Sequence, residues 1–224
     1  MTDVLVLHDV GDPAGGAPWA EAFSDAGWSG AVHAPDLPGH AGEAPPLGGS
    51  YNGADPALTG ALVVAGLPAG GPPPVVVGVR ASGWGAQLLA LGGRAAALVL
   101  VDGLGGPWLD GTAAVAADRA WLRRLADDPE AVGPAPPGAP LDPRLRHGVP
   151  PQADRGLAMR AAAAVPVPVL VLHTGVPGTG PLADGEADDL SAAFRRSDVV
   201  RLGPPASLPE VARVVVEWTR RESL

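Results

Sequence analysis

The chain has 224 residues, 46% of them hydrophobic, and a formal net charge of −9, which suits one α/β domain with its own core. Cysteine and lysine are both absent, which excludes disulfides, thiol catalysis, thiolate metal sites, a Schiff-base lysine and a P-loop lysine. The acidic balance, without a large arginine cluster, argues against nucleic acid and membrane surfaces as partners. No apolar run reaches the roughly 18 residues that span a bilayer, and no secretory signal opens the sequence, so we expect a cytoplasmic protein.

Short apolar runs, typical of strands buried on both faces, alternate along the chain with segments of helical spacing. In chain order we expect a strand at Val4–His8, a helix at Ala17–Gly27, a strand at Gly30–Ala34, a helix from Asp55, a strand at Pro74–Val79, a helix at Ser82–Leu91, strands at Ala97–Asp102, Val167–His173 and Asp198–Leu202, and a helix at Ser207–Arg221. An acidic helix start at Asp184–Asp189 lies between the last two strands. This alternation predicts a parallel sheet with helices on both faces.

One long segment, residues 103–164, interrupts the alternation between two predicted strands. It contains two helices, about Ala113–Asp127 and Asp154–Ala164, separated by a loop rich in proline and glycine at Pro129–Pro151. A long excursion between two sheet strands is usually a cap or lid. Because no other linker is long enough to separate two domains, we expect residues 1–224 to form a single domain with this lid inserted.

Three stretches together resemble segments of the α/β-hydrolase family. They are V-L-V-L-H-D-V-G-D at Val4–Asp12, H-A-P-D-L-P-G-H-A at His33–Ala41 and V-V-V-G-V-R-A-S-G at Val75–Gly83. In the family these positions hold an oxyanion-hole loop, the segment after the next strand and the nucleophile elbow. The resemblance implies a three-layer fold whose mostly parallel sheet has six strands in the order 4-3-5-6-7-8 of the family's labels, with the family's first two strands missing.

The elbow stretch departs from the family at its central position. The family pattern is Gly-x-Ser-x-Gly, with small residues around a nucleophile on a strained turn. Here the small residues are Gly78 and Ser82, and Arg80 stands between them. Arginine stays protonated and cannot attack a carbonyl carbon. The alternative frame, with Ser82 as nucleophile, places Arg80 and Trp84 where glycines belong.

The acid and the base of the family's triad are also missing from their usual places. After His173 the sequence runs T-G-V-P-G-T-G, and no carboxylate follows until Asp184; the loop at Gly203–Glu210 contains no histidine. Asp102 follows the preceding strand and could replace the acid, and His147 in the lid could swing toward the site. The candidate catalytic residues are therefore Arg80, Asp102 and His147, and hydrolysis by a triad is not expected.

Arg80 has a second chemical meaning, because a cation at the start of a helix is unfavourable unless an anion joins it. Asp9 and Asp102 should lie at the same edge of the sheet, so an internal ion pair with one of them is expected. The alternative is a bound carboxylate or phosphate, held also by the oxyanion-hole amides that the resemblance places at Val10 and Ala81. The candidate ligand-binding residues are His8, Asp9, Val10, Arg80, Ala81, Asp102 and Trp108.

Three functions remain open from the sequence. The first is a non-hydrolytic protein that binds a small, anionic, partly apolar molecule under the lid. The second is an esterase, lyase or isomerase that uses Arg80, Asp9, Asp102 and His147. The third is an interaction protein whose own side chains fill the cleft. No histidine and carboxylate stand at metal-ligand spacing, so neither a metal nor a cofactor is expected, and nothing indicates an oligomeric state.

Overall fold

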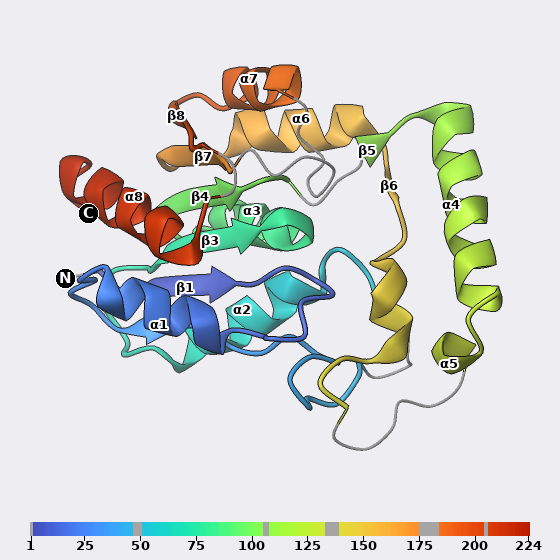
Figure 1. Ribbon diagram of the computed structural model, residues 1–224. Helices are drawn as coiled ribbons and strands as arrows, with labels where there is room; N and C mark the ends of the chain where they lie inside the picture. The colour runs from blue at the N-terminus through green and yellow to red at the C-terminus, as the bar shows by residue number, and fades with distance from the viewer. Residues whose placement is uncertain (1, 47–50, 105–107, 133–138, 175–183, 204–205) are drawn as a thin grey trace.

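The sheet is the centre of the molecule (Figure 1). The computed structural model describes residues 2–46, 51–104, 108–132, 139–174, 184–203 and 206–224. Within them, six strands form one sheet in the order β2-β1-β3-β4-β7-β8, with every neighbouring pair parallel. The strands are β1 (Val4–Leu7), β2 (Val32–His33), β3 (Val75–Val79), β4 (Ala97–Val101), β7 (Val169–His173) and β8 (Ser197–Arg201). This order is the one that the resemblance implies, so the predicted topology is confirmed.

The central strands are buried on both faces, which explains their unbroken apolar sequences. Every residue of β1, β3 and β4 is buried, whereas β2 and β8 at the two edges of the sheet are half-buried or exposed. Along β1, Val4 and Val6 belong to the core on one face, and Leu5 and Leu7 belong to the core on the other. Alternation of this kind follows from the two-residue period of a strand.

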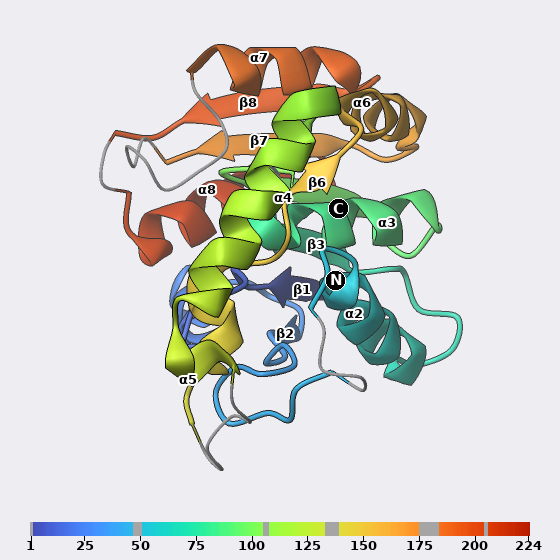
Figure 2. The same cartoon turned by 90° about the vertical axis from the view of Figure 1, so that its right-hand side faces the viewer.

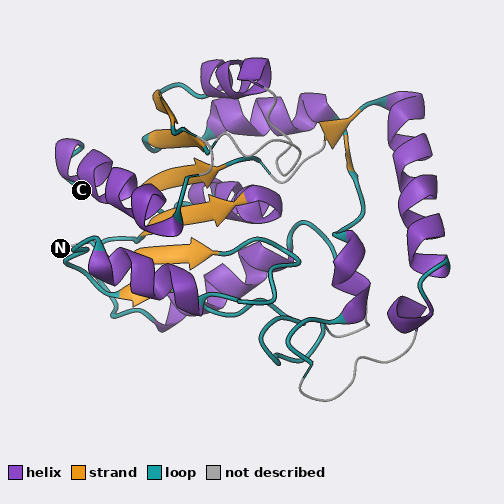
Figure 3. Cartoon of the chain, in the orientation of Figure 1, coloured by secondary structure: helices purple, strands orange, loops and turns teal. Residues whose placement is uncertain are grey.

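Helices cover both faces of the sheet and complete three layers (Figure 3). One face carries α1 (Ala17–Asp25) and α8 (Leu208–Arg221), which pack on each other and on the valine side of the sheet. The other face carries α2 (Asp55–Gly66), α3 (Gly83–Leu91), α6 (Arg155–Ala164) and α7 (Asp184–Ala193). Most predicted bounds lie within two residues of the observed ones. The strand predicted at Gly30–Ala34 is shorter in the structure, because only Val32 and His33 pair with β1.

The inserted segment, described over residues 108–132 and 139–153, lies beyond the carboxyl ends of the strands (Figure 1), and Figure 2 views the molecule from that side. It comprises β5 (Trp108–Leu109), α4 (Gly111–Ala126), α5 (Pro129–Val132), a 3-10 turn η2 (Pro143–His147) and β6 (Gln152–Ala153), with β5 and β6 paired to each other. The sequence predicts a lid over residues 103–164. Its boundary at Ala164 moves to residue 153, because Ala158 and Ala162 of α6 are buried in the main core. Residues 133–138 of the predicted loop lie outside the described residues.

Two parts of the inserted segment, η2 and α4, differ in how firmly they are attached to the core. Residues 140–142 pair with the loop at residues 39–41, through a bridge between His40 and Leu141 and a hydrogen bond from the Asp142 amide to the Gly39 carbonyl. Leu145 of η2 is only 1% exposed. By contrast, none of the 16 residues of α4, all of them described, is buried. The η2 part is therefore anchored to the core, and α4 rests on it. None of the described helices is long and apolar enough to cross a membrane.

Candidate functional site

The tight turn after β3 has the backbone geometry of a nucleophile elbow, with an arginine at its tip. Arg80 has a φ of +44°, a left-handed conformation that costs a non-glycine residue about 1–3 kcal/mol. Gly78 has no room for a side chain, since an added Cβ would lie 2.6 Å from the Cβ of Ala86. Gly83 is equally confined, since a Cβ added to it would lie 2.3 Å from the Gly103 carbonyl oxygen. Gly78 thus lets β3 and α3 approach closely, and Gly83 lets α3 approach the backbone that follows β4. The turn projects Arg80 from the sheet edge.

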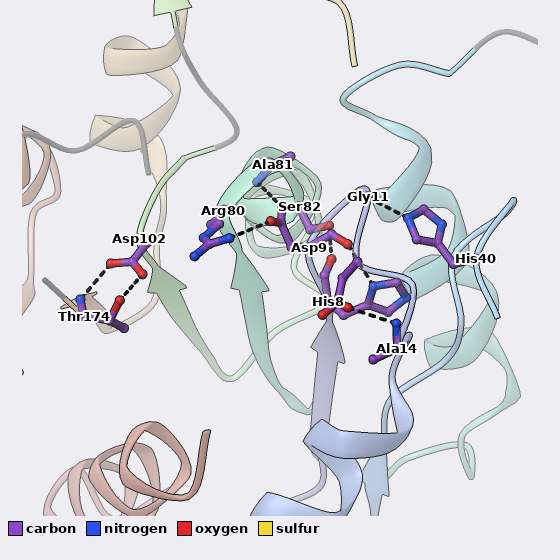
Figure 4. A network of polar contacts seen from close by, with 11 residues as sticks. His8, Asp9, Gly11, Ala14, His40, Arg80, Ala81, Ser82, Asp102 and Thr174 are labelled. Atoms are coloured by element: carbon purple, nitrogen blue, oxygen red, sulfur yellow. Dashed lines mark hydrogen bonds and ion pairs between the residues drawn. The ribbon is translucent and has the colours of Figure 1, made fainter. Parts of the chain in front are cut away.

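The guanidinium of Arg80 pairs with Asp9 (Figure 4). Its Nη1 lies 3.2 Å from Oδ2 of Asp9, and the backbone N–H of Ala81 donates to Oδ1 of the same carboxylate at 3.2 Å. Of the two acids that the sequence proposes as partners, the structure therefore selects Asp9. The side chains are 31% exposed for Arg80 and 20% exposed for Asp9. The Ala81 amide, which the resemblance assigns to the oxyanion hole, is thus occupied by a carboxylate of the protein itself.

Two neutral histidines hold the loop that carries Asp9. Nε2 of His8 accepts the Leu37 amide and Nε2 of His40 accepts the Gly11 amide, while each Nδ1 faces a backbone carbonyl oxygen. Both rings are therefore the tautomer with hydrogen on Nδ1. Burial lowers the pKa of His8 and of His40, the charged form being poorly solvated there. The P-D-L-P-G-H stretch thus acts structurally, by fixing the loop after β1.

Burial also changes the acidity of Asp9. The loss of water around it raises the pKa of its carboxyl to about 6, although the nearby Arg80 and the Ala81 amide act in the opposite direction. Asp12, on the same loop, adds a smaller contribution that also raises the pKa. Asp9 can therefore exchange a proton near neutral pH, which an ordinary aspartate cannot.

Ser82 is turned away from the surface. It is completely buried, and its hydroxyl donates to the carbonyl oxygen of His8 at the end of β1. No histidine ring nitrogen accepts from it in the described residues. The alternative frame of the elbow, with Ser82 as nucleophile, therefore has neither exposure nor a base in this structure.

Asp102 forms a second, separate polar group beside the elbow (Figure 4). Its Oδ1 accepts the Thr174 amide at 2.7 Å and its Oδ2 accepts the Thr174 hydroxyl. Asp102 follows β4, has a φ of +54° and is buried. The carboxylate therefore joins the carboxyl ends of β4 and β7, and within the described residues it makes no ion pair with Arg80.

A cavity of about 470 Å³ opens at this edge of the sheet. Its charged walls come from separate parts of the chain: Asp9, Asp12, Arg80, Asp102 and Arg146. Its remaining walls are Val10, Gly11, Trp19, Val79, Val101, Leu145, Gly148, Thr174, Ala206, Leu208 and Val211. The cavity thus lies where four parts of the chain meet: the elbow, the end of β4, the end of β7 and the loop after β8. A cleft filled by the protein's own side chains would leave no such space.

Four of the predicted ligand-binding residues line this cavity, namely Asp9, Val10, Arg80 and Asp102, and three do not. His8 is buried beneath the loop, and Ala81 contributes its amide to Asp9. Trp108 packs edge-on against Trp84, with ring centroids 4.8 Å apart, and donates to the Leu104 carbonyl. Trp108 therefore belongs to the base of the inserted segment rather than to the cavity wall.

His147 also has a different place from the one predicted. The sequence predicts that it can swing toward the site, but its Nε2 lies 3.0 Å from Oδ2 of Asp128, within the inserted segment. The contact lowers the pKa of Asp128. Its neighbour Arg146 lines the cavity instead and pairs with Glu130. His147 is thus a contact between η2 and the residues after α4.

Arg146 and Thr174 are site residues that sequence reasoning misses. Arg146 stands in a loop whose position depends on the anchoring of η2 to the core, and no local pattern encodes that contact. Thr174 has a signal that could find it, since it directly follows a predicted buried strand, where parallel sheets place polar site residues. The family's acid position at residues 175–180 and part of its histidine loop, residues 204–205, lie outside the described residues.

Solved structures with a similar fold are α/β hydrolases and esterases. An α/β hydrolase from Sphaerobacter thermophilus has a TM-score of 0.64 and 19% identity, over 97% of this chain and 92% of that one. A thermophilic esterase from Thermogutta terrifontis, solved with malate bound, has 0.67 and 19%, over 99% and 90%. An esterase from Mycobacterium tuberculosis has 0.59 and 21%, over 100% and 84%. These likenesses show the fold. No protein-family model matches the sequence, and no curated protein matches it.

Proposed function

We propose that this α/β-hydrolase-fold protein binds a small molecule carrying a carboxylate or phosphate group in the cavity at Arg80, without hydrolysing it. The proposal rests on the identity of the residue at the tip of the elbow, which is Arg80. In a nucleophile elbow the tip of the strained turn presents a nucleophile to the substrate. Here the same tip presents a guanidinium to a cavity of about 470 Å³. An arginine recognises planar anions through a fork of donors and supplies no nucleophile.

The bonding of Arg80 supports an anionic ligand. Its Nη1 is used by Asp9, while Nη2 and Nε have no hydrogen-bond partner among the described residues. The side chain is partly exposed to the cavity, so these donors are available to a ligand. The second guanidinium in the wall, that of Arg146, is paired only with the exposed Glu130 in the described part of the chain. A carboxylate or phosphate would satisfy donors that the protein leaves open.

The arrangement of hydroxyls and histidines supports the absence of triad hydrolysis. Among the described residues that line the cavity there is no histidine and no serine. The hydroxyl in the wall belongs to Thr174, and it is already donated to Asp102. A serine-hydrolase mechanism needs a base within hydrogen-bond reach of the nucleophile, and these residues do not provide one.

Asp9 favours one alternative, an enzyme of lyase or isomerase type. A carboxyl with a pKa of about 6, in a cavity and beside a cation, can take up and release a proton during a reaction. In that case Arg80 would hold the substrate and Asp9 would move its proton. The alternative requires product formation that Asp9→Asn abolishes while ligand binding persists.

Thermal melting with a panel of small anions tests the proposal. The panel is butyrate, L-malate and inorganic phosphate, with the neutral butyramide as a matched control; malate is included because the Thermogutta terrifontis esterase was solved with it. We expect at least one anion to raise the Tm of the protein. Arg80→Gln should remove that rise, and Arg94→Gln, at an exposed site, should preserve it. Equal stabilisation of wild type and Arg80→Gln would contradict the proposal.

A further inference from the structure

Asp9 occupies two of the donors that an incoming anion could use beside the open Nη2 and Nε of Arg80. Its two carboxylate oxygens accept from the Ala81 amide and from Nη1 of Arg80, both at 3.2 Å. A carboxylate bound to these two donors resembles an exogenous carboxylate ligand in charge, shape and hydrogen bonding. The free donors of Arg80 lie on the same guanidinium, at the wall of the cavity. Any anion that binds Arg80 therefore meets a competing anion of the protein.

We propose that Asp9 is a built-in competitor, which a monoanionic carboxylate ligand displaces from Arg80 and Ala81 as Asp9 takes up one proton from solvent. This inference rests on the proposed function and specifies how the anion binds. Before binding, the pair consists of one guanidinium cation and one carboxylate anion. Afterwards the ligand supplies the anion, and Asp9 is a neutral acid with a new O–H bond. The net charge around Arg80 is thereby kept, and no oxidant or other reactant is needed.

The surroundings of Asp9 favour this exchange over simple co-binding. Two carboxylates sharing one guanidinium repel each other, and at a partly buried site this repulsion is screened less than in bulk water. Protonating one of them removes the repulsion, and the pKa of Asp9, raised to about 6 by burial, makes it the easiest one to protonate. Asp102 is bound by two donors from Thr174, so it is held in place and does not compete.

The proton uptake assigned to Asp9 can be distinguished from the titration of the other groups that face it. The charged ones lining the cavity are Asp12 on the same loop, Asp102 after β4 and Arg146 on η2, besides Arg80 itself. His8 precedes Asp9 and contacts the ring of His40 with centroids 5.0 Å apart. Burial lowers the pKa of both histidines below 6.5, so they stay neutral at higher pH. α1 and α8 contribute the uncharged Trp19, Leu208 and Val211 to the wall.

The pH dependence of butyrate binding tests the exchange, because butyrate stays monoanionic from pH 6.5 to 8.5. The Kd would be measured by NMR titration in Bis-Tris and Tris buffers at constant chloride, with proton uptake taken from calorimetry in buffers of different ionisation heat. One proton taken up per ligand makes the Kd rise about tenfold per pH unit above the pKa of Asp9. We expect that slope, and an uptake close to one proton at pH 7.5, in wild type.

Two variants make the test specific. Asp9→Asn keeps the shape of the side chain but cannot titrate, so it should bind butyrate more tightly at pH 8 with a flat pH profile and no proton uptake. Asp12→Asn removes a charge from the same loop and should keep the wild-type slope. If Asp9→Asn fails to fold, the wild-type slope and proton uptake decide the question.

The two proposals fail in different ways. Butyrate binding that depends on Arg80, with a pH-independent Kd and no proton uptake, would overturn the exchange and leave the proposed function standing. A wild-type slope that survives in a folded Asp9→Asn variant would overturn it as well. Absence of butyrate binding in both wild type and folded Asp9→Asn would overturn the exchange, and failure of the whole anion panel would overturn the proposed function.

Discussion

Oδ2 of Asp9 lies 3.2 Å from Nη1 of Arg80, although the two residues are 71 positions apart in the sequence. Asp9 stands in the loop after β1 and Arg80 in the turn after β3, and these two strands are parallel neighbours. Their carboxyl ends therefore meet at one edge of the sheet, where a ligand site of an α/β fold is expected. The pair combines a strained backbone, a partly exposed cation and a carboxyl that titrates near neutral pH.

Replacing Arg80 should destabilise the free protein. Arg80→Ala leaves the Asp9 carboxylate without its cation, and we expect a loss of about 1–2 kcal/mol in the free energy of unfolding, less than for a fully buried pair because both side chains keep some solvent contact. Arg80→Gly should be less destabilising than Arg80→Ala by about 1 kcal/mol, since glycine adopts a positive φ without strain. Urea denaturation of the two variants checks this, and equal stabilities would contradict a strained elbow.

Acid should destabilise the protein through His8 and His40. Each has a folded-state pKa below the ordinary value of 6.5, so each is neutral in the fold and binds a proton more readily once unfolded. Their contribution is therefore present above pH 6.5 and is lost as the pH falls below it, by at most about 1.4 kcal/mol per pH unit for each ring. Denaturation at pH 7.5, 6.5 and 5.5 measures the loss, and a stability that rose steadily toward pH 5.5 would count against it.

Asp9 should oppose that acid effect. Its folded pKa of about 6 is above the ordinary value of 3.8, so its contribution to stability is fully present below pH 3.8 and is lost as the pH rises through 6. Between pH 6 and 4, protonating Asp9 therefore favours the fold while protonating the histidines favours unfolding. Asp9→Asn should lose stability more steeply than wild type over this range. Parallel pH profiles of the two proteins would show that Asp9 does not titrate there.

The two parts of the inserted segment should respond differently to the same substitution. Leu145→Ala removes a side chain that is 1% exposed and anchors η2, so a loss of about 2–3 kcal/mol is expected. Leu122→Ala on α4 removes a side chain that is 51% exposed, and its effect should stay within about 0.5 kcal/mol. Limited proteolysis should cut the Leu145→Ala variant faster within residues 108–153. Equal losses in the two variants would contradict the anchoring.

Much of this arrangement follows from the sequence because it depends on local patterns. Apolar runs such as Val75–Val79 predict buried parallel strands, and parallel strands bring the residues after them to a common edge. That reasoning reaches Asp9, Asp102 and Arg80 as neighbours. It cannot choose between the two acids, since the choice depends on the Ala81 amide facing Asp9 and on Thr174 already binding Asp102.

The placements that the sequence does not predict depend on contacts made across long loops. His147 and Trp108 are placed by pairings inside the inserted segment, with Asp128 and Trp84, that no periodicity encodes. The sequence assigns helix α6 to the lid because α6 lies in the long segment between two predicted strands, whereas its packing through Ala158 and Ala162 places it in the core. Arg146 enters the site by the same tertiary route.

Ester hydrolysis should be absent from the purified protein. Ser82 is buried and donates to the His8 carbonyl, so p-nitrophenyl acetate should not be cleaved above background in a way that depends on Ser82. Ser82→Ala should cost about 1 kcal/mol of stability through the lost hydrogen bond, with the esterase background unchanged. Robust activity that Ser82→Ala abolishes would overturn the non-hydrolytic account; weak activity shared by both proteins would not.

A crystal structure with a bound carboxylate would show whether Arg80 holds the anionic group of a ligand. Crystals of the wild-type protein and of Asp9→Asn would be soaked with L-malate and with butyrate. We predict a carboxylate within hydrogen-bond distance of the Arg80 guanidinium, inside the cavity lined by Asp102, Thr174 and Leu145, with Asp9 moved away from the Ala81 amide in wild type. An empty cavity in both proteins, or a carboxylate bound there without contact to Arg80, would contradict anion binding by Arg80.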